Sequence, residues 1–259
     1  PPWRTGKLLD APFVTARLPN GMELIVVEQH KQPVVTVSLA LPGGNIYEPA
    51  DKVGLADFVA ELLTKGTESR TADQISAQVE GAGGNIGAGA DPDFLRVSFS
   101  ALAENLPLAL NVIADVVQHS TFPATEVELI RTRMLSSLQM QLSQPAAIAA
   151  RIFLREVYGT HPYGRSATTA TLRAVTREDI VAFFNQRVKP SGALLVVAGD
   201  VNAARVRQLA TEAFASWTGA PAAAAAAPAI PAHGATEIVL VHKPGAVQSN
   251  ILAGFPFIT

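Results

Sequence analysis

The sequence predicts an α+β fold for this chain of 259 residues. Two strand-like runs come first and are followed by helices, a hairpin, more helices, one strand and a last helix. Because strands and helices do not alternate regularly, α+β fits this order better than a βαβ fold does. The composition is typical of a globular protein, with 48% hydrophobic and 16% charged residues and a mean hydropathy of +0.24.

The first elements are two strands and a helix. A turn at Pro19-Asn20-Gly21 is followed by two runs rich in β-branched residues, 22–27 and 34–39, which predict two neighbouring strands. Over residues 55–64 apolar residues recur at helical spacing, which predicts a helix with one buried face. The residues of that face are Leu55, Phe58, Val59, Leu62 and Leu63.

The middle of the chain predicts a second helix and a hairpin. Thr71 is a typical N-cap residue, and the helix that follows it ends at Gly81. The glycine-rich stretch 83–90 leads into 94–99, where apolar and polar residues alternate, so the two form a hairpin. The same periodicities predict helices over 106–118, 124–142, 147–157, 176–187 and 202–217, and a short buried strand over 193–198.

A change of composition near the end predicts a domain boundary. Residues 221–231 are almost wholly Ala and Pro, as in an interdomain linker. Two apolar runs, 237–241 and 250–254, flank a turn at Lys243-Pro244-Gly245 and predict two further strands. The predicted division is one domain over 1–217, a linker over 218–234, and the first strands of a second, truncated domain over 235–259.

Charge and composition exclude several classes of function. The net charge is -2 and no Lys/Arg cluster is present, so nucleic acid is not expected as a partner. No apolar run approaches the ~20 residues of a membrane span. The absence of cysteine excludes disulfides, thiolate metal sites and a cysteine nucleophile.

Residues 54–67 read Gly-Leu-Ala-Asp-Phe-Val-Ala-Glu-Leu-Leu-Thr-Lys-Gly-Thr. This block resembles the signature of the insulinase/pitrilysin-like zinc peptidases, most closely the processing-peptidase subfamily. In that family it carries the inverted zinc motif H-x-x-E-H. Positions i, i+3 and i+4 share one helical face, so two imidazoles can bind zinc while the carboxylate activates the bound water. The resemblance implies a layered fold, a mostly antiparallel sheet covered by helices, with 55–64 as the metal-site helix.

Further motifs extend the resemblance over about residues 13–217. His161 lies in one of them, within a Pro/Gly turn, and we interpret it as a loop histidine that holds the local fold. The motifs are Asn20-Gly21-Met22, Gly83-Gly84-Asn85, His161-Pro162-Tyr163-Gly164-Arg165 and Gly199-Asp200-Val201.

The zinc motif itself is replaced. Asp57 stands where the resemblance places the first His, Glu61 where it places the second, and Ala60 where it places the general base. The third ligand implied by the resemblance is a Glu inside the long helix, yet residues 131–155 contain no Asp or Glu. We therefore expect no catalytic residues, no bound metal and no cofactor in this chain, and no peptide hydrolysis by the chain alone.

Asp57 and Glu61 leave three interpretations open. They can be two solvated carboxylates on an exposed helix face, oxygen ligands for Mg²⁺, Ca²⁺ or Mn²⁺, or a catalytic version of such a site. A separate candidate site is the edge strand at Asn85, Ile86, Gly87 and Ala88. In the family the corresponding strand holds extended peptide by strand addition, so these residues are candidate substrate contacts.

The resemblance implies a non-catalytic subunit of a heterodimeric processing-peptidase-like zinc metallopeptidase. Such a subunit shapes the chamber and helps to bind peptide, while a partner chain carries the intact motif and the zinc. The alternative is a structural or peptide-binding scaffold without a protease partner. The habit of the family and a start that lacks Met favour an exported or periplasmic bacterial protein.

Overall fold

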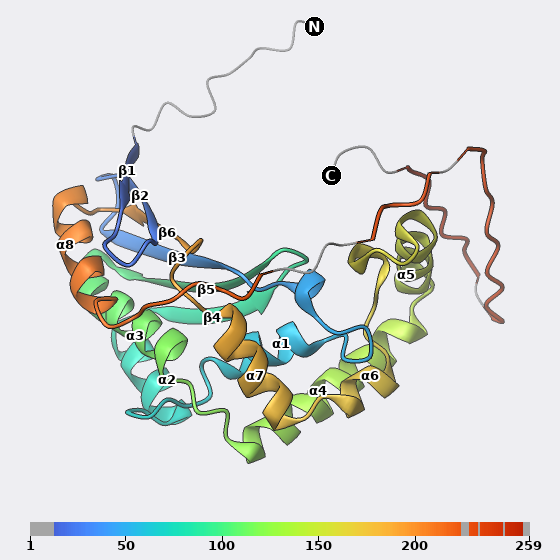
Figure 1. Cartoon of the computed structure of the whole chain (residues 1–259), viewed down its shortest axis with the longest axis horizontal. Coiled ribbons are helices and arrows are strands. Elements are labelled where there is room, and N and C mark those ends of the chain that lie inside the picture. Colours follow the sequence, from blue (N-terminus) through green and yellow to red (C-terminus); the bar gives the residue numbers. More distant parts are fainter. Residues whose placement is uncertain (1–12, 224–227, 233, 246, 256–259) are drawn as a thin grey trace, which may run out of the picture.

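The computed structural model describes residues 13–223, 228–232, 234–245 and 247–255. It contains one six-stranded sheet with the strand order β1-β2-β6-β3-β5-β4 (Figure 1). The predicted hairpin is formed by β4 and β5. The strands are β1 (Phe13–Arg17), β2 (Glu23–Glu28), β3 (Val34–Pro42), β4 (Asn85–Ala90), β5 (Phe94–Leu102) and β6 (Leu194–Gly199).

The sheet is mostly antiparallel, and only β2 and β6 run parallel. This confirms the fold class, but the prediction that the first two strand-like runs are neighbours is wrong. Strand β6 lies between them, with Val197 opposite Val26 on one side and Val37 on the other. The pairing joins segments more than 150 residues apart, so the local sequence around β2 and β3 does not contain it.

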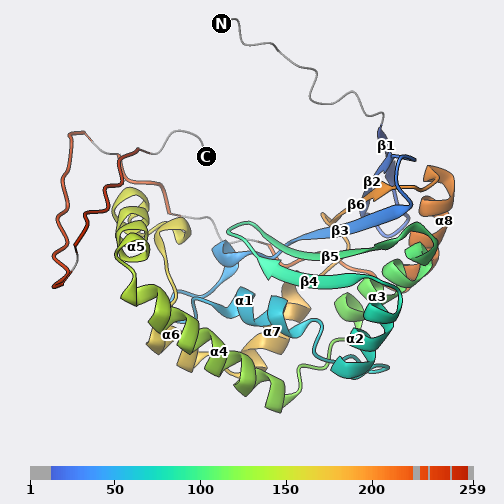
Figure 2. The ribbon, with the colours of Figure 1, turned by 180° about the vertical axis from the view of Figure 1, so that it is seen from behind.

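Side chains alternate between two unlike faces of the sheet. Val35, Val37 and Leu39 of β3 are buried, whereas Thr36 on the opposite face is exposed. Helices α1, α3 and α7 lie along the buried face (Figures 1 and 2). The helices are α1 (Leu55–Leu62), α2 (Ala72–Gly81), α3 (Leu106–Gln118), α4 (Ala124–Ser143), α5 (Pro145–Tyr158), α6 (Thr169–Ala174), α7 (Arg177–Arg187) and α8 (Ala203–Ala213).

Several helices begin where their capping residues predict. Thr71 and Gln74 form a reciprocal capping box at the start of α2, and Thr176 and Asp179 form another at α7. The side chain of Asn202 accepts the N–H of Arg205 at the start of α8. Strand β1 and helix α6 were not expected from the sequence. Three short 3₁₀ segments, Asn45–Tyr47, Ala103–Asn105 and Pro162–Gly164, complete the regular structure.

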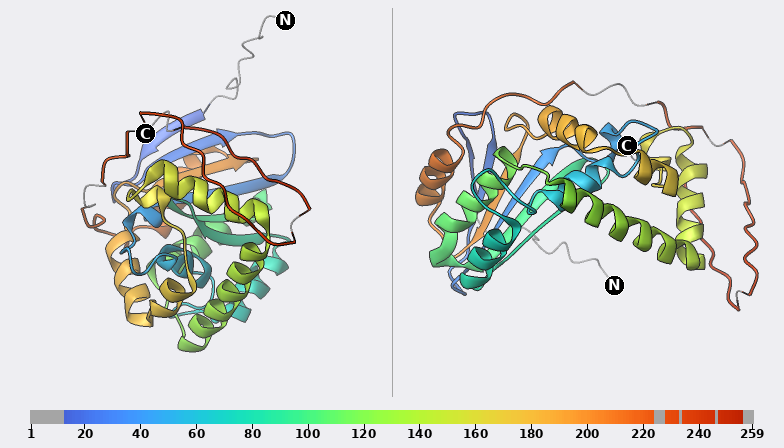
Figure 3. Two further views of the ribbon diagram at one scale, coloured as in Figure 1. Left: turned by 90° about the vertical axis from the view of Figure 1, so that its right-hand side faces the viewer. Right: turned by 90° about the horizontal axis from the view of Figure 1, so that it is seen from below.

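Residues 228–232, 234–245 and 247–255 run in largely extended form past α5 (Figure 3). Lys243 donates to the carbonyl of Ser143, and Gly254 lies against the ring of Phe153. The turn at Pro244 and Gly245 forms, but the strands predicted over 237–241 and 250–254 are wrong, because neither run is a strand in the structure. A lone two-stranded hairpin is marginal in water, and no neighbouring element covers Ile238 and Leu240, which are 88% and 92% exposed.

The predicted division into domains stays a prediction. Parts of it fall on residues 1–12, 224–227, 233, 246 and 256–259, which lie outside the described residues. No helix in the described part of the chain is both long enough and apolar enough to cross a bilayer.

Candidate functional site

The motif residues lie on α1, which is one of the most buried helices of the domain. Phe58, Val59, Ala60 and Leu62 are fully buried, and the helix packs against α4, α7 and β4. Gly54 precedes α1 with φ +105°, and a Cβ there would come within 2.6 Å of Leu172. The helix predicted over 55–64 is therefore confirmed, with its position fixed by packing on three sides.

Glu48 anchors the start of α1. Its carboxylate accepts the N–H of Ala56 at 2.7 Å and the N–H of Gly54 at 3.1 Å. These are two of the helix-start donors that have no partner within the helix. The side chain is only 4% exposed, and burial raises the pKa of Glu48 to about 7 even though these hydrogen bonds act in the opposite direction.

Asp57 is joined to Glu48 through one amide. The Asn45 side chain donates to Glu48 Oε1 at 3.1 Å and to Asp57 Oδ2 at 3.5 Å. Burial raises the pKa of Asp57 to about 6, the Asn45 hydrogen bond lowers it, and the charge of Glu61 raises it further. Asp57 is therefore half-buried and hydrogen-bonded to Asn45, so the interpretation of Asp57 as a solvated carboxylate on an exposed face fits only in part.

Glu61 is paired across to the long helix. Its carboxylate forms an ion pair with Arg133 of α4, and both side chains are partly exposed. The region where the resemblance implies a third, acidic ligand thus supplies a guanidinium to this face. Ala60 lies one residue before Glu61 on the same turn and is fully buried, so its methyl group contributes packing but no proton transfer.

The residues of this face do not fit a zinc ion. Asp57 is hydrogen-bonded to Asn45, Glu61 is neutralised by Arg133, and the nearby positive charge of Arg133 opposes a second cation. Within the described residues no group of three or more His, Cys, Asp or Glu side chains could hold a metal ion.

The candidate edge strand β4 lies beside α1 (Figure 2). It pairs with β5 on one side and ends the sheet on the other. Ile86 and Ala88 pack against the core, whereas Asn85 and Gly87 are exposed on the opposite face. The strand therefore has an unpaired backbone edge next to the motif helix, which is the geometry that strand addition requires.

His161 lies in a cluster of aromatic rings with Tyr158 and Tyr163. Its Nδ1 accepts the N–H of Tyr163 at 3.2 Å, and the two rings pack with centroids 4.7 Å apart. Tyr163 in turn donates its hydroxyl to Asp93 at 2.6 Å, in the turn between β4 and β5. This arrangement agrees with the interpretation of His161 as a residue that holds the local fold.

Sequence reasoning did not identify Asn45, Glu48 and Arg133. Each acts through a tertiary contact whose partner lies on another element, so a periodic pattern contains no signal for it. The absence of acidic residues over 131–155 was visible in the sequence, and Arg133, one of four arginines in that stretch, is the residue that meets Glu61.

Comparison with protein families gives two matches. The model described as insulinase (peptidase family M16) matches residues 24–171, more than half of the chain, and the model described as peptidase M16 inactive domain matches residues 174–259. The boundary between the two models does not divide the fold, because β6 belongs to the second match and pairs with β2 and β3 of the first.

Related sequences include zinc proteases and subunits of mitochondrial complexes. An uncharacterized zinc protease of Mycobacterium leprae is 30% identical over 77% of this chain and 45% of its own length. The mitochondrial-processing peptidase subunit beta of Dictyostelium discoideum is 25% identical over 77% of this chain and 43% of its own. Subunit 1 of the cytochrome b-c1 complex of Bos taurus is 25% identical over 79% and 43%. The chain thus spans about half the length, or less, of these relatives.

Solved structures show the same fold. The peptidase M16 inactive domain from Pseudomonas fluorescens superposes with a TM-score of 0.75 at 24% identity, over 83% of this chain and 53% of that one. The periplasmic protease PqqL of Escherichia coli superposes with a TM-score of 0.76 at 17% identity, over 85% of this chain and 25% of that one.

Proposed function

The chain belongs to the insulinase family, peptidase family M16, and from this premise we propose that it is the non-catalytic part of a heterodimeric zinc peptidase. In this proposal the partner chain carries the intact H-x-x-E-H motif and the zinc. The present chain closes the chamber and contributes to the binding of peptide.

The observation that carries the proposal is the ion pair between Glu61 and Arg133. It joins α1 to α4 and uses the charge of Glu61, which stands where the resemblance places the second ligand. A zinc ion at this face would have to displace the guanidinium and would then meet oxygen donors only, without imidazole. With Ala60 in place of a general base, a contribution of roughly 10²–10⁴-fold to the rate is also lost.

The edge strand β4 supports a role in peptide binding. Gly87 and Gly89 carry no side chain, and a Cβ at either position would meet open space. An extended peptide could therefore approach the unpaired edge without steric hindrance and add to the sheet by main-chain hydrogen bonds. Asn85, Ile86, Gly87 and Ala88 are the proposed contacts.

The second candidate function is a structural or peptide-binding scaffold without a protease partner. It is favoured by the similarity to a subunit of the cytochrome b-c1 complex, just as the similarity to a processing-peptidase subunit favours the first candidate. A metal-dependent enzyme built on Asp57 and Glu61 fits less well, because both carboxylates have protein partners. For the compartment, an exported or periplasmic location is proposed, in line with the periplasmic neighbour from Escherichia coli.

The test is reconstitution with a chain of the same family that carries an intact motif. The two chains are co-expressed, the complex is purified through a tag on the present chain, and peptide cleavage is measured for each chain and for the mixture. We expect co-purification and a higher kcat/KM for the mixture than for the partner alone. Stable co-purification with no change in cleavage would favour the scaffold.

A further inference from the structure

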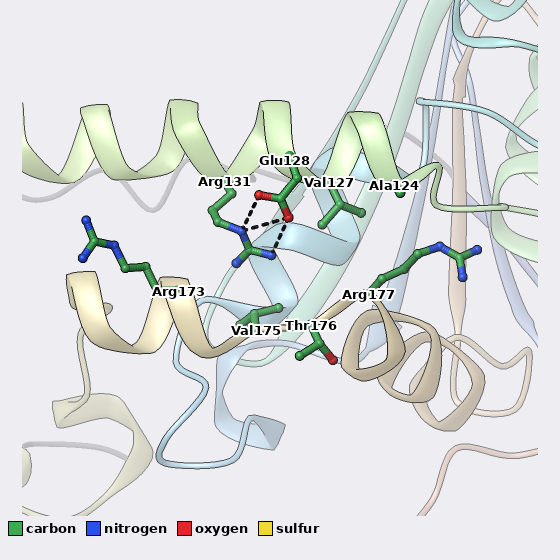
Figure 4. Close-up of a pocket in the computed structure, with 8 residues that line it drawn as sticks. All are labelled: Ala124, Val127, Glu128, Arg131, Arg173, Val175, Thr176 and Arg177. Atoms are coloured by element: carbon green, nitrogen blue, oxygen red, sulfur yellow. Dashed lines mark hydrogen bonds and ion pairs between the residues drawn. The ribbon is translucent and has the colours of Figure 1, made fainter.

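A cleft of about 440 Å³ lies between the first half of α4, the end of α6 and the start of α7 (Figure 4). Three arginines line it, Arg131, Arg173 and Arg177, together with one carboxylate, Glu128. Arg131 precedes Arg133 by two residues, which is ~200° around a helix. The cleft therefore lies on the opposite side of α4 from the ion pair with Glu61, and it has no part in the proposed function.

The positive charge of the cleft is only partly compensated. Arg131 is held by Glu128 at 3.1 Å and lies over the ring of Phe58. Arg177 donates to the carbonyl oxygens of Phe122 and Thr121 at 2.7 and 2.8 Å, which are neutral groups and leave its charge intact. Arg173 is exposed and has no ion-pair or hydrogen-bond partner in the part of the chain that the structure describes.

Neither acidic residue in the first turn of α7, Glu178 or Asp179, lines the cleft. Asp179 caps the helix through Thr176 and forms an ion pair with Lys52. Glu128 is the one acidic side chain that lines the cleft, and it is shared with Arg131. The lining therefore keeps an excess of two positive charges, which attracts an anionic ligand.

The arrangement of the arginines selects the shape of that ligand. Arg173 and Arg177 lie at opposite ends of the cleft and point away from each other, with Val127 and Val175 between them (Figure 4). A single phosphate needs donors that converge on one point, and these do not. An extended chain with acidic side chains at both ends matches the two separated charges, whereas Val127 and Val175 between them are buried and offer little surface to a ligand.

We propose that this cleft binds an extended acidic peptide segment of another protein. Carboxylates of the segment pair with Arg173 and Arg177, and its main chain spans the cleft between them. Glu128 repels the carboxylates of the segment and so lowers its affinity for the cleft.

The test uses a fluorescein-labelled peptide with glutamates at both ends and uncharged residues in the middle, and measures its anisotropy with the full chain at low salt. We expect Arg173→Gln to weaken binding about threefold to tenfold, as for the loss of one charge-assisted contact. We expect Glu128→Gln to tighten it about twofold to fivefold. The matched control is Arg207→Gln on α8, an exposed arginine outside the cleft, which should leave binding unchanged.

We expect Arg173→Gln to lower the affinity for the peptide and Glu128→Gln to raise it. A loss of folding would instead lower the affinity in both variants. Equal effects of Arg173→Gln and Arg207→Gln would overturn the proposal. It would also be overturned if inorganic phosphate, or a single-stranded oligonucleotide of the same charge, bound the cleft as tightly as the peptide does. Absence of peptide binding to the unchanged chain would overturn it outright.

Discussion

The arginines on the two sides of α4 differ in whether an acidic side chain compensates their charge. On the side that faces α1, Arg133 pairs with Glu61, and the neighbouring carboxylate Asp57 is hydrogen-bonded to Asn45. On the other side, Arg173 has no partner within the described residues, and Arg177 meets only backbone carbonyls. The charges of Glu61 and Arg133 thus compensate each other at the position where the resemblance implies a metal. The positive charges of Arg173 and Arg177 have no acidic partner within the described residues, and the motif has no residue there.

This difference separates two kinds of contribution. The contacts around α1 join elements that pack into the core, so replacing these residues should affect stability. By the proposal, the same contacts prevent metal binding. Arg173 at the α4, α6 and α7 cleft is exposed and has no partner within the described residues, so its replacement should affect recognition and leave the fold intact. Each prediction below tests one side of this comparison.

The largest effect is expected at Glu48. Its replacement, Glu48→Ala, leaves the N–H groups of Gly54 and Ala56 buried without an acceptor, which should lower the free energy of unfolding by about 2–4 kcal/mol. Urea denaturation measures the change. Glu48→Gln keeps an acceptor oxygen and serves as the matched control, with a smaller expected loss. A loss below about 0.5 kcal/mol for the alanine variant would contradict the anchoring role.

The next effect is a dependence of stability on pH. The pKa values of Glu48 (about 7) and Asp57 (about 6) are raised above their ordinary values of 4.5 and 3.8. The folded chain therefore holds protons that the unfolded chain has released, so stability falls as pH rises through this range. We expect a loss of about 1–3 kcal/mol between about pH 5 and about pH 7.5.

Asp57→Asn should flatten the lower part of this pH profile, because it removes one of the two raised carboxyls. Asp51→Asn, at an exposed position nearby, is the matched control and should leave the profile unchanged. A rise in stability over the same pH range in the unchanged chain would show that these carboxyls are not buried as described.

A smaller effect is expected for the pair Glu61 and Arg133. Both side chains are partly exposed, so a double-mutant cycle with Glu61→Gln and Arg133→Gln should give a coupling energy of about 0.2–1 kcal/mol that decreases with salt. The measurement is the free energy of unfolding of the four proteins at two salt concentrations. A coupling energy of zero at low salt would show that the ion pair does not contribute to stability.

The smallest effect on stability is expected for Arg173→Gln. An exposed side chain without a partner should change the free energy of unfolding by less than about 0.5 kcal/mol, even where binding of acidic peptide weakens severalfold. Thermal denaturation and peptide binding measured on the same sample check this separation. A large loss of stability would show that Arg173 stabilises the fold and would contradict its assignment to ligand recognition alone.

Much of the fold follows from short-range patterns. The caps at Thr71 and Thr176, the hairpin of β4 and β5, and the helix at the motif were all predictable, because each depends on residues close together in sequence. The insertion of β6 between β2 and β3 was not, since it depends on a pairing across the whole domain. The runs at 237–241 and 250–254 have the composition of strands, but they lack a neighbour to pair with.

The candidate site divides in the same way. The resemblance of residues 54–67 to the family signature identified Asp57, Ala60 and Glu61, which all lie on α1. The partners that decide what these residues can do, Asn45 and Arg133, come from other elements. The spacing along α1 also does not show that Asp57 is half-buried and hydrogen-bonded to Asn45.

The central claim is that the face of α1 holds no metal and performs no hydrolysis. The most direct measurement is the zinc content of the purified chain after dialysis against trace zinc, with peptidase activity assayed on the same sample. The account predicts no stoichiometric zinc and no cleavage by the chain alone. Bound zinc at one equivalent, with cleavage that a chelator abolishes and that Glu61→Gln removes, would contradict it.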